Sequence, residues 1–184
     1  MAKFTFGLLL TAVVLSAAPI TYNVDLTIGA GSVTGFIETD GTIGTLSSSN
    51  ILNWDLLLND GTTTFTLEGP LSGSNSGLEL VGVDLSATST QLLFNYSGTD
   101  DGWALFQAPE PGSGRDWFCP STTTNCSSGA TGNNLEITGA QQTTALSGTQ
   151  AIGNVAGGVP EPSAISLMTL GVAGLAFWKR RASC

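Results

Sequence analysis

Acidic side chains are the main candidates for chemistry in this chain, because the other usual catalytic groups are missing. The sequence contains no histidine, and no lysine lies between residues 19 and 158. Ser-His-Asp and Cys-His catalysis, His-containing zinc sites and Schiff-base chemistry are therefore excluded there. The clustered acids are Asp100 beside Asp101, and Glu110 near Asp116. Paired carboxylates could in principle hydrolyse a glycosidic bond.

The spacing of Asp100 and Asp101 nevertheless favours a turn. Adjacent residues of a strand point to opposite faces, so the two carboxylates would not converge on one substrate. Calcium binding is a better use of such acids, but Thr99-Asp100-Asp101-Gly102 and Asn59-Asp60-Gly61 lack the alternating ligands and distal glutamate of an EF-hand loop. We therefore expect no catalytic residues, no metal site, no cofactor and no enzymatic activity.

A second hypothesis is carbohydrate binding through aromatic side chains. Four aromatic residues could form a sugar-stacking surface, although alternating strand positions are more typical of core residues. They are Trp103, Phe106, Trp117 and Phe118. In this alternative the chain is a secreted carbohydrate-binding module, with or without calcium, and its candidate ligand surface consists of Trp103, Trp117, Asp100 and Asp101.

The elements that would position these residues are short strands. Apolar and polar residues alternate with period two in nine runs: Ile20 to Ile28, Val33 to Thr39, Ile51 to Leu58, Thr62 to Leu67, Leu78 to Leu85, Thr90 to Tyr96, Trp103 to Gln107, Leu135 to Thr138 and Thr144 to Leu146. Asp40-Gly41 and Asn59-Asp60-Gly61 predict tight turns, and Trp54 is a predicted core residue. The pattern predicts an all-β, antiparallel β-sandwich or jelly-roll-like domain, with helix only at the two termini.

Between Ala108 and Asn134 the strand pattern stops. The prolines and glycines at positions 109, 111, 112 and 114, together with Pro120, predict an irregular loop, while Trp117 and Phe118 predict that it is held in place. Export would place this loop in an oxidising compartment and leave Cys184 on the cytoplasmic side. By elimination, Cys119 and Cys126 are predicted to form a disulfide.

The charge of the central region excludes one class of partner. Residues 19–158 carry thirteen acids against Arg115 as the one base, for a net charge of −12. Such a region cannot release phosphate counterions, so nucleic acid and anionic lipid are not expected as its partners.

Both ends of the chain indicate export. Met1-Ala2-Lys3, the apolar run from Phe4 to Leu15 and the small residues at 16–18 form a signal-peptide pattern. At the other end, residues 159–163 read Val-Pro-Glu-Pro-Ser, an extended peptide. Residues 164–178 are largely apolar and would reach about 22 Å as a helix, short of the roughly 30 Å hydrocarbon core.

The basic cluster Lys179, Arg180 and Arg181 completes this tail. Long basic side chains can snorkel, and the cluster should stay cytoplasmic, which places Glu161 outside. Residues 164–178 are therefore predicted to span the inner membrane marginally, with help from these flanks.

The order of box, apolar run and basic cluster resembles the PEP-CTERM sorting tail of Gram-negative bacteria, also catalogued as the ice-binding protein C-terminal domain. Pro160, Glu161 and Pro162 carry the match, which covers the last 26 of 184 residues. The resemblance implies that exosortase, a membrane-embedded cysteine protease, recognises the box and releases the protein to the cell surface or an exopolysaccharide matrix. Cys184 departs from the pattern. The alternative is an ordinary C-terminal membrane anchor.

The sequence thus predicts four segments. They are a signal peptide (1–18), an exported all-β domain (19–146), a glycine-rich flexible spacer (147–158) and a sorting tail (159–184). Exosortase and the inner membrane are the expected transient partners, and exopolysaccharide is a further candidate. The expected function is that of a non-catalytic cell-surface or matrix protein.

Overall fold

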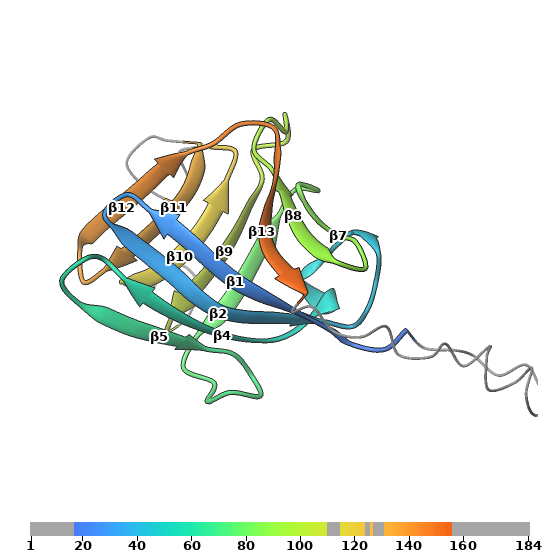
Figure 1. Cartoon of the computed structure of the whole chain (residues 1–184), viewed down its shortest axis with the longest axis horizontal. Coiled ribbons are helices and arrows are strands. Elements are labelled where there is room, and N and C mark those ends of the chain that lie inside the picture. Colours follow the sequence, from blue (N-terminus) through green and yellow to red (C-terminus); the bar gives the residue numbers. More distant parts are fainter. Residues whose placement is uncertain (1–16, 110–114, 124–125, 127–130, 156–184) are drawn as a thin grey trace, which may run out of the picture.

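The computed structural model describes residues 17–109, 115–123, 126 and 131–155. These residues form two antiparallel sheets (Figure 1). In spatial order, the eight-stranded sheet consists of β3 (Gly44–Thr45), β7 (Leu85–Ala87), β8 (Gln91–Asn95), β13 (Thr149–Val155), β1 (Ile20–Ile28), β2 (Gly31–Thr39), β4 (Ile51–Asn59) and β5 (Thr64–Glu68). The five-stranded sheet consists of β12 (Ala140–Ala145), β11 (Gly132–Ile137), β10 (Asp116–Ser121), β9 (Trp103–Ala108) and β6 (Gly77–Val81). The prediction of an all-β body is confirmed.

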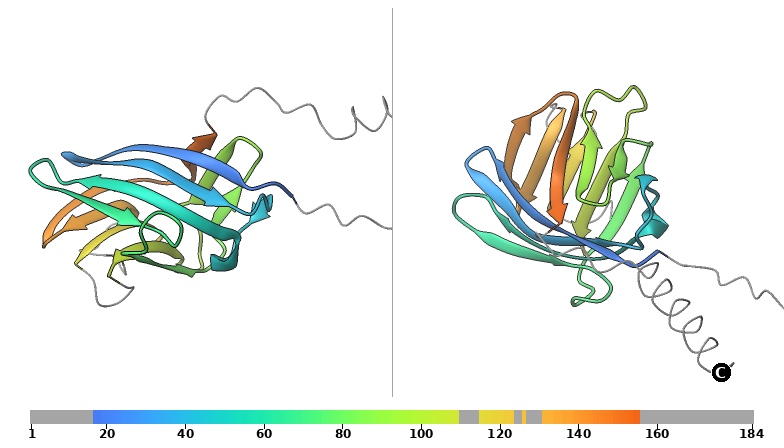
Figure 2. Two further views of the ribbon diagram at one scale, coloured as in Figure 1. Left: turned by 90° about the horizontal axis from the view of Figure 1, so that it is seen from below. Right: turned by 45° about the vertical axis from the view of Figure 1, so that its right-hand side comes forward.

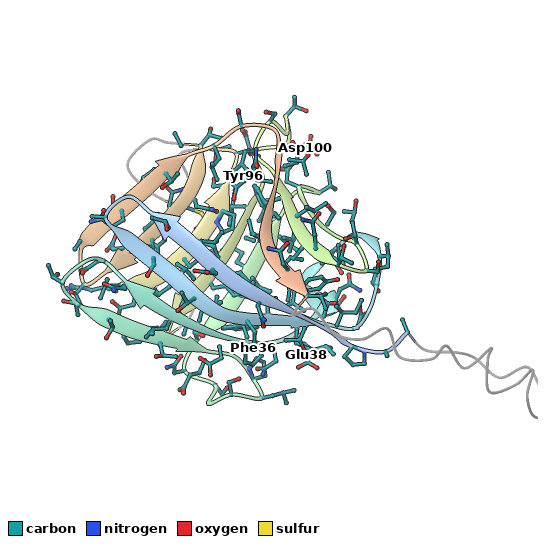
Figure 3. The ribbon with its side chains drawn as sticks, in the orientation of Figure 1. Phe36, Glu38, Tyr96 and Asp100 are labelled. Carbon is teal, nitrogen blue, oxygen red and sulfur yellow. A yellow bond between two sulfur atoms is a disulfide. The ribbon has the colours of Figure 1, made fainter. Side chains whose placement is uncertain are left out.

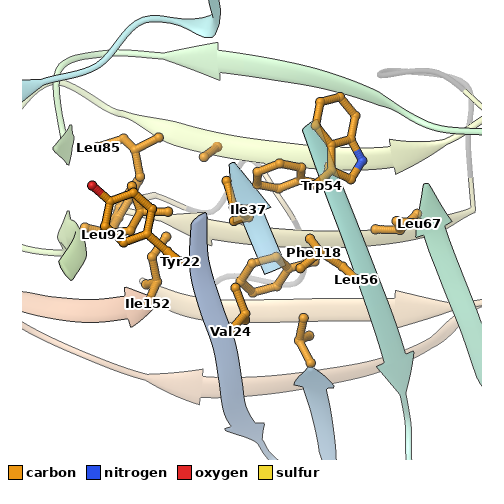
Figure 4. Close-up of a cluster of buried hydrophobic side chains, with 14 of the residues drawn as sticks. Tyr22, Val24, Ile37, Trp54, Leu56, Leu67, Leu85, Leu92, Phe118 and Ile152 are labelled. Atoms are coloured by element: carbon orange, nitrogen blue, oxygen red, sulfur yellow. The ribbon is translucent and has the colours of Figure 1, made fainter. Parts of the chain in front are cut away.

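The inner faces of the two sheets share one hydrophobic core, which Figure 4 shows in close-up. Val24, Ile37 and Leu56 enter it from the larger sheet, and Phe118 and Leu135 from the smaller. The alternation that predicted the strands produces this core, because every second side chain of each strand points inward. Figure 2 shows the two sheets from further directions.

Trp54 joins the two sheets, as its predicted core position requires. Its ring meets that of Phe106 edge to face, with centroids 5.4 Å apart. Its indole Nε1 donates a hydrogen bond to Ser76 Oγ at 2.9 Å, so the polar end of the side chain is also satisfied.

The predicted spacer at 147–158 is wrong over residues 149–155. These residues form β13, which pairs with β8 on one side and β1 on the other. Gly153 faces β1 so closely that a Cβ added to it would stand 3.0 Å from the Cβ of Tyr22. Glycine at this position permits close packing of backbones and does not indicate flexibility.

The predicted irregular loop between Ala108 and Asn134 is also wrong in part, because residues 116–121 form β10 at the centre of the smaller sheet. Pro120 pairs with Asn133 on β11, while the pairing with β9 passes from Phe118 to Ser121 without it. A proline fits a strand at a position where its missing N–H is not needed.

One predicted turn and one predicted strand also differ from the structure. Asp40-Gly41 does not close a hairpin, because β2 pairs with β4 after an intervening loop, which the Asp40 N–H closes by donating to the Asn50 carbonyl. The predicted strand Leu78 to Leu85 is divided at Gly82 (φ 79°) into β6 and β7, which belong to different sheets. The Asn59 turn does join paired strands, β4 and β5.

No helix within the described residues is long and apolar enough to cross a membrane. The predicted membrane segment, 164–178, and the signal peptide up to residue 16 lie outside the described residues.

Candidate functional site

The predicted ligand surface is split by the structure into a turn and a covered part of the smaller sheet. Asp100 and Asp101 are exposed in the turn between β8 and β9. Trp103 and Trp117 lie on the outer face of the smaller sheet, away from the main core. Trp117 is only 7% exposed, so it offers little area for stacking on a sugar.

Phe106 and Phe118 do not belong to this surface. They point into the main core and stack on each other with centroids 6.1 Å apart. The sequence alternative in which these aromatics are core residues is correct for this pair.

The disulfide is placed on the same outer face. The structure pairs Cys119 with Cys126, as predicted, with 6.0 Å between their Cα atoms. Together with Trp117 they form a small buried cluster, against which Trp103 and Leu105 pack. The disulfide therefore holds Cys126 against β10.

The outer face of the smaller sheet is polar around this cluster. Gln107 lies opposite Trp117, which lies opposite Glu136 on β11. Glu136 Oε2 accepts a hydrogen bond from Gln141 Nε2 at 2.6 Å. Gln107 is itself buried, and the Glu136 carboxylate is held by Gln141.

The turn at Asp60 uses its carboxylate for local structure. Asp60 Oδ1 accepts hydrogen bonds from the backbone N–H groups of Thr62 and Thr63, both at 2.7 Å, and from the Thr62 hydroxyl. The Thr63 and Thr62 N–H groups lower the pKa of Asp60. The interpretation of Asn59-Asp60-Gly61 as an ordinary turn therefore agrees with the structure.

Asp84 is the acid that the sequence reasoning missed. It lies between β6 and β7, is 5% exposed, and its Oδ2 is buried without a hydrogen-bond partner. Burial raises the pKa of Asp84, and the negative charge of Asp100 raises it further. The available signal was an acid within the apolar run Leu78 to Leu85, with no base near it in sequence.

Two buried tyrosines donate hydroxyl hydrogen bonds to residues far from them in the sequence. The Tyr96 hydroxyl donates to Asn133 Oδ1, which links β11 to the residue after β8, and burial raises the pKa of Tyr96 far above its usual value. Asp100 lies at the same end of the molecule as Tyr96, remote from Phe36 and Glu38 (Figure 3). The Tyr22 hydroxyl donates to the Thr88 carbonyl at 2.6 Å.

The described residues contain no group of three or more His, Cys, Asp or Glu side chains that could hold a metal ion. The predicted sorting residues Pro160, Glu161 and Pro162, and the basic cluster Lys179, Arg180 and Arg181, lie outside the described part of the chain.

Comparison with known families identifies this tail. Residues 158–181 match the PEP-CTERM protein-sorting motif. The matched range contains both the Pro-Glu-Pro box and the basic cluster, and the motif supports exosortase-dependent sorting of a surface protein. No curated protein and no solved structure matches the chain, so the PEP-CTERM motif carries the functional assignment.

Proposed function

We propose that this chain is an exported protein whose PEP-CTERM motif is a cleavable sorting signal. Its body is a non-catalytic β-sandwich of the cell surface or exopolysaccharide matrix. The motif at 158–181 is the observation that carries the proposal. Two residues, 156 and 157, separate β13 from the motif, so cleavage near its start would release a body with all its strands. The signal peptide and membrane segment belong to the proposal as the means of export and temporary tethering.

The composition of the body supports a location outside the cell. Removing the tail also removes Lys179, Arg180 and Arg181, and leaves a region with a net charge of −12. Like charges on such a domain oppose aggregation in a crowded matrix. The absence of histidine from the sequence, together with the position of Asp100 and Asp101 in an exposed turn, supports a binding or structural role for the body over catalysis.

The experiment that tests sorting replaces Pro160, Glu161 and Pro162 with alanine in a host that contains exosortase. The native protein should yield a shorter form at the surface or in the medium, and the variant should stay full length in the inner membrane. Pro70→Ala, at an exposed loop position, is the matched control and should be sorted normally. Identical size and location for the native and triple-variant proteins would leave an ordinary membrane anchor.

A carbohydrate-binding body is the second candidate, and the half-buried Trp103 beside the polar outer face of the smaller sheet favours it. Binding to a glycan array that Trp103→Ala abolishes, with the fold unchanged, would support this alternative. Turnover of a polysaccharide that is lost in Asp101→Asn or Glu110→Gln would contradict the non-catalytic assignment.

A further inference from the structure

The surroundings of Asp84 are shaped to receive its carboxylate. A Cβ added to Gly98 would collide with Asp84 Oδ1, and one added to Gly102 would collide with Oδ2. Neither glycine has a positive φ, so the backbone conformation does not require glycine at these two positions. The space taken by the carboxylate does require it. The two glycines bracket Asp100 and Asp101, so the Asp84 side chain is directed into the acidic turn.

The described part of the chain places no positive side chain beside this buried acid. Arg115 is the one base between residues 19 and 158, and it precedes Asp116, which pairs with Ala108. Asp84 is instead beside Gly102, at the other end of β9. Six strand residues span about 17 Å, too far for an ion pair. Ionisation of a buried carboxylate that lacks both a hydrogen bond and a counter-charge is energetically unfavourable.

Further oxygen atoms lie close to Asp84. The Val81 carbonyl oxygen is 3.1 Å from the point where a Gly102 Cβ would stand, and Asp84 Oδ2 is nearer still to that point. The two oxygens are therefore neighbours on one side of Gly102. Asp100, which interacts electrostatically with Asp84, adds a second carboxylate on an exposed turn. The donors gathered here are all hard oxygens.

We propose that Asp84 and Asp100 bind a calcium ion, with carbonyl oxygens such as that of Val81 and water completing its coordination. Calcium takes six to eight oxygen ligands in flexible geometry, which suits a turn better than the strict octahedron of magnesium does. Zinc and later transition metals prefer nitrogen or sulfur ligands, and Cys119 and Cys126 are joined in a disulfide. With two carboxylates, the affinity should fall in the range of extracellular modules, about 10⁻⁴ to 10⁻³ M.

The position of this site agrees with a role outside the cell. Ser97 Oγ accepts a hydrogen bond from the Gly148 N–H at 2.7 Å, which places the acidic turn beside the start of β13. The tail follows the other end of that strand, about 20 Å away for seven extended residues. The site therefore lies at the end of the body remote from the tail attachment.

The test uses the full chain in detergent and Ca²⁺ alone as the probe. Thermal unfolding is followed in EDTA and with increasing CaCl₂ up to about 10 mM, and binding is measured by calorimetry. The wild-type melting temperature should rise and saturate. Asp84→Asn keeps the shape and removes the charge, so it should fold but lose at least about tenfold in affinity for Ca²⁺. Asp100→Asn, at an exposed position, should weaken binding in the same direction.

Asp25→Asn is the matched control, because Asp25 is an exposed acid within β1. It should bind Ca²⁺ as the wild type does. A wild-type melting temperature that does not respond to Ca²⁺ would overturn the proposal. Equal binding by Asp84→Asn, Asp25→Asn and the wild type would overturn it too, because binding would then reflect the overall negative charge. Sorting of the protein is a separate measurement, so failure here leaves the PEP-CTERM assignment unaffected.

Discussion

Tyr22 on β1 is paired with Val155 on β13, so the first and last strands of the body are neighbours in one sheet. The predicted signal peptide precedes β1, and the PEP-CTERM motif follows β13. Both segments are consequently attached at the same end of the body. The opposite end, with the acidic turn, is directed away from that attachment.

The pairing makes β13 essential to the fold. Deleting residues 147–155 should abolish cooperative unfolding, because β8 and β1 would lose the strand between them and Ile152, 1% exposed, would leave the core. Deleting residues 159–184 instead should preserve both the β-type circular dichroism spectrum and the melting temperature. Similar cooperative melting of the two truncated proteins would show that β13 is dispensable.

Much of the larger sheet was predictable because its strands alternate strictly. Residues 20–28 alternate along their whole length, and β1 has the predicted bounds. Asn59-Asp60-Gly61 marked the β4–β5 turn because Asp60 bonds to the backbone of its own turn, which is a local interaction. Such features depend on neighbouring residues only, so a sequence pattern can reveal them.

The errors came from residues whose role is set by distant partners. Gly153 suggested flexibility, yet it permits β13 to approach Tyr22. Pro120 suggested a loop, yet its strand is held between β9 and β11. Asp84 lies in an apolar run, and only the fold brings it against Gly98 and Gly102. As an aromatic residue, Trp117 suggested a ligand surface, but it packs on the disulfide.

The Cys119–Cys126 disulfide should stabilise the body modestly. Replacing both cysteines with serine should lower the free energy of unfolding by about 2–3 kcal/mol, the value expected for closing a short loop. The midpoint of urea denaturation measures the effect, and tryptophan fluorescence should change because Trp117 packs on Cys119 and Cys126. Reduced wild-type protein is the control and should resemble the variant. An unchanged midpoint would contradict a stabilising role.

Trp54 should be among the most sensitive core positions, because it contacts Phe106 of the other sheet and bonds to Ser76. Trp54→Ala should cost about 3–5 kcal/mol of unfolding free energy. Ser76→Ala removes only the partner of the indole N–H and should cost about 1 kcal/mol. Leu57→Ala is the control within the same strand: its side chain is 42% exposed, and the change should cost no more than about 0.5 kcal/mol. Equal losses at Trp54 and Leu57 would contradict this order.

Acid should destabilise the body partly through Asp60. The Thr63 and Thr62 N–H groups lower its pKa in the folded state, so its contribution to stability is present above the unfolded pKa of about 4 and is lost as pH falls through the folded value. Asp60→Asn should therefore be less stable than the wild type at neutral pH, and the difference should shrink below about pH 4. Melting temperatures between pH 7 and about pH 2 measure this convergence.

Asp40→Asn should behave likewise, because the hydrogen bond from the Asn50 side chain is the largest of the effects that lower the pKa of Asp40. Asp25→Asn, exposed on β1, is the control for the general effect of removing one negative charge. A difference between Asp60→Asn and the wild type that stays constant across the pH range, after correction by this control, would mean that the turn is stabilised equally by the protonated acid.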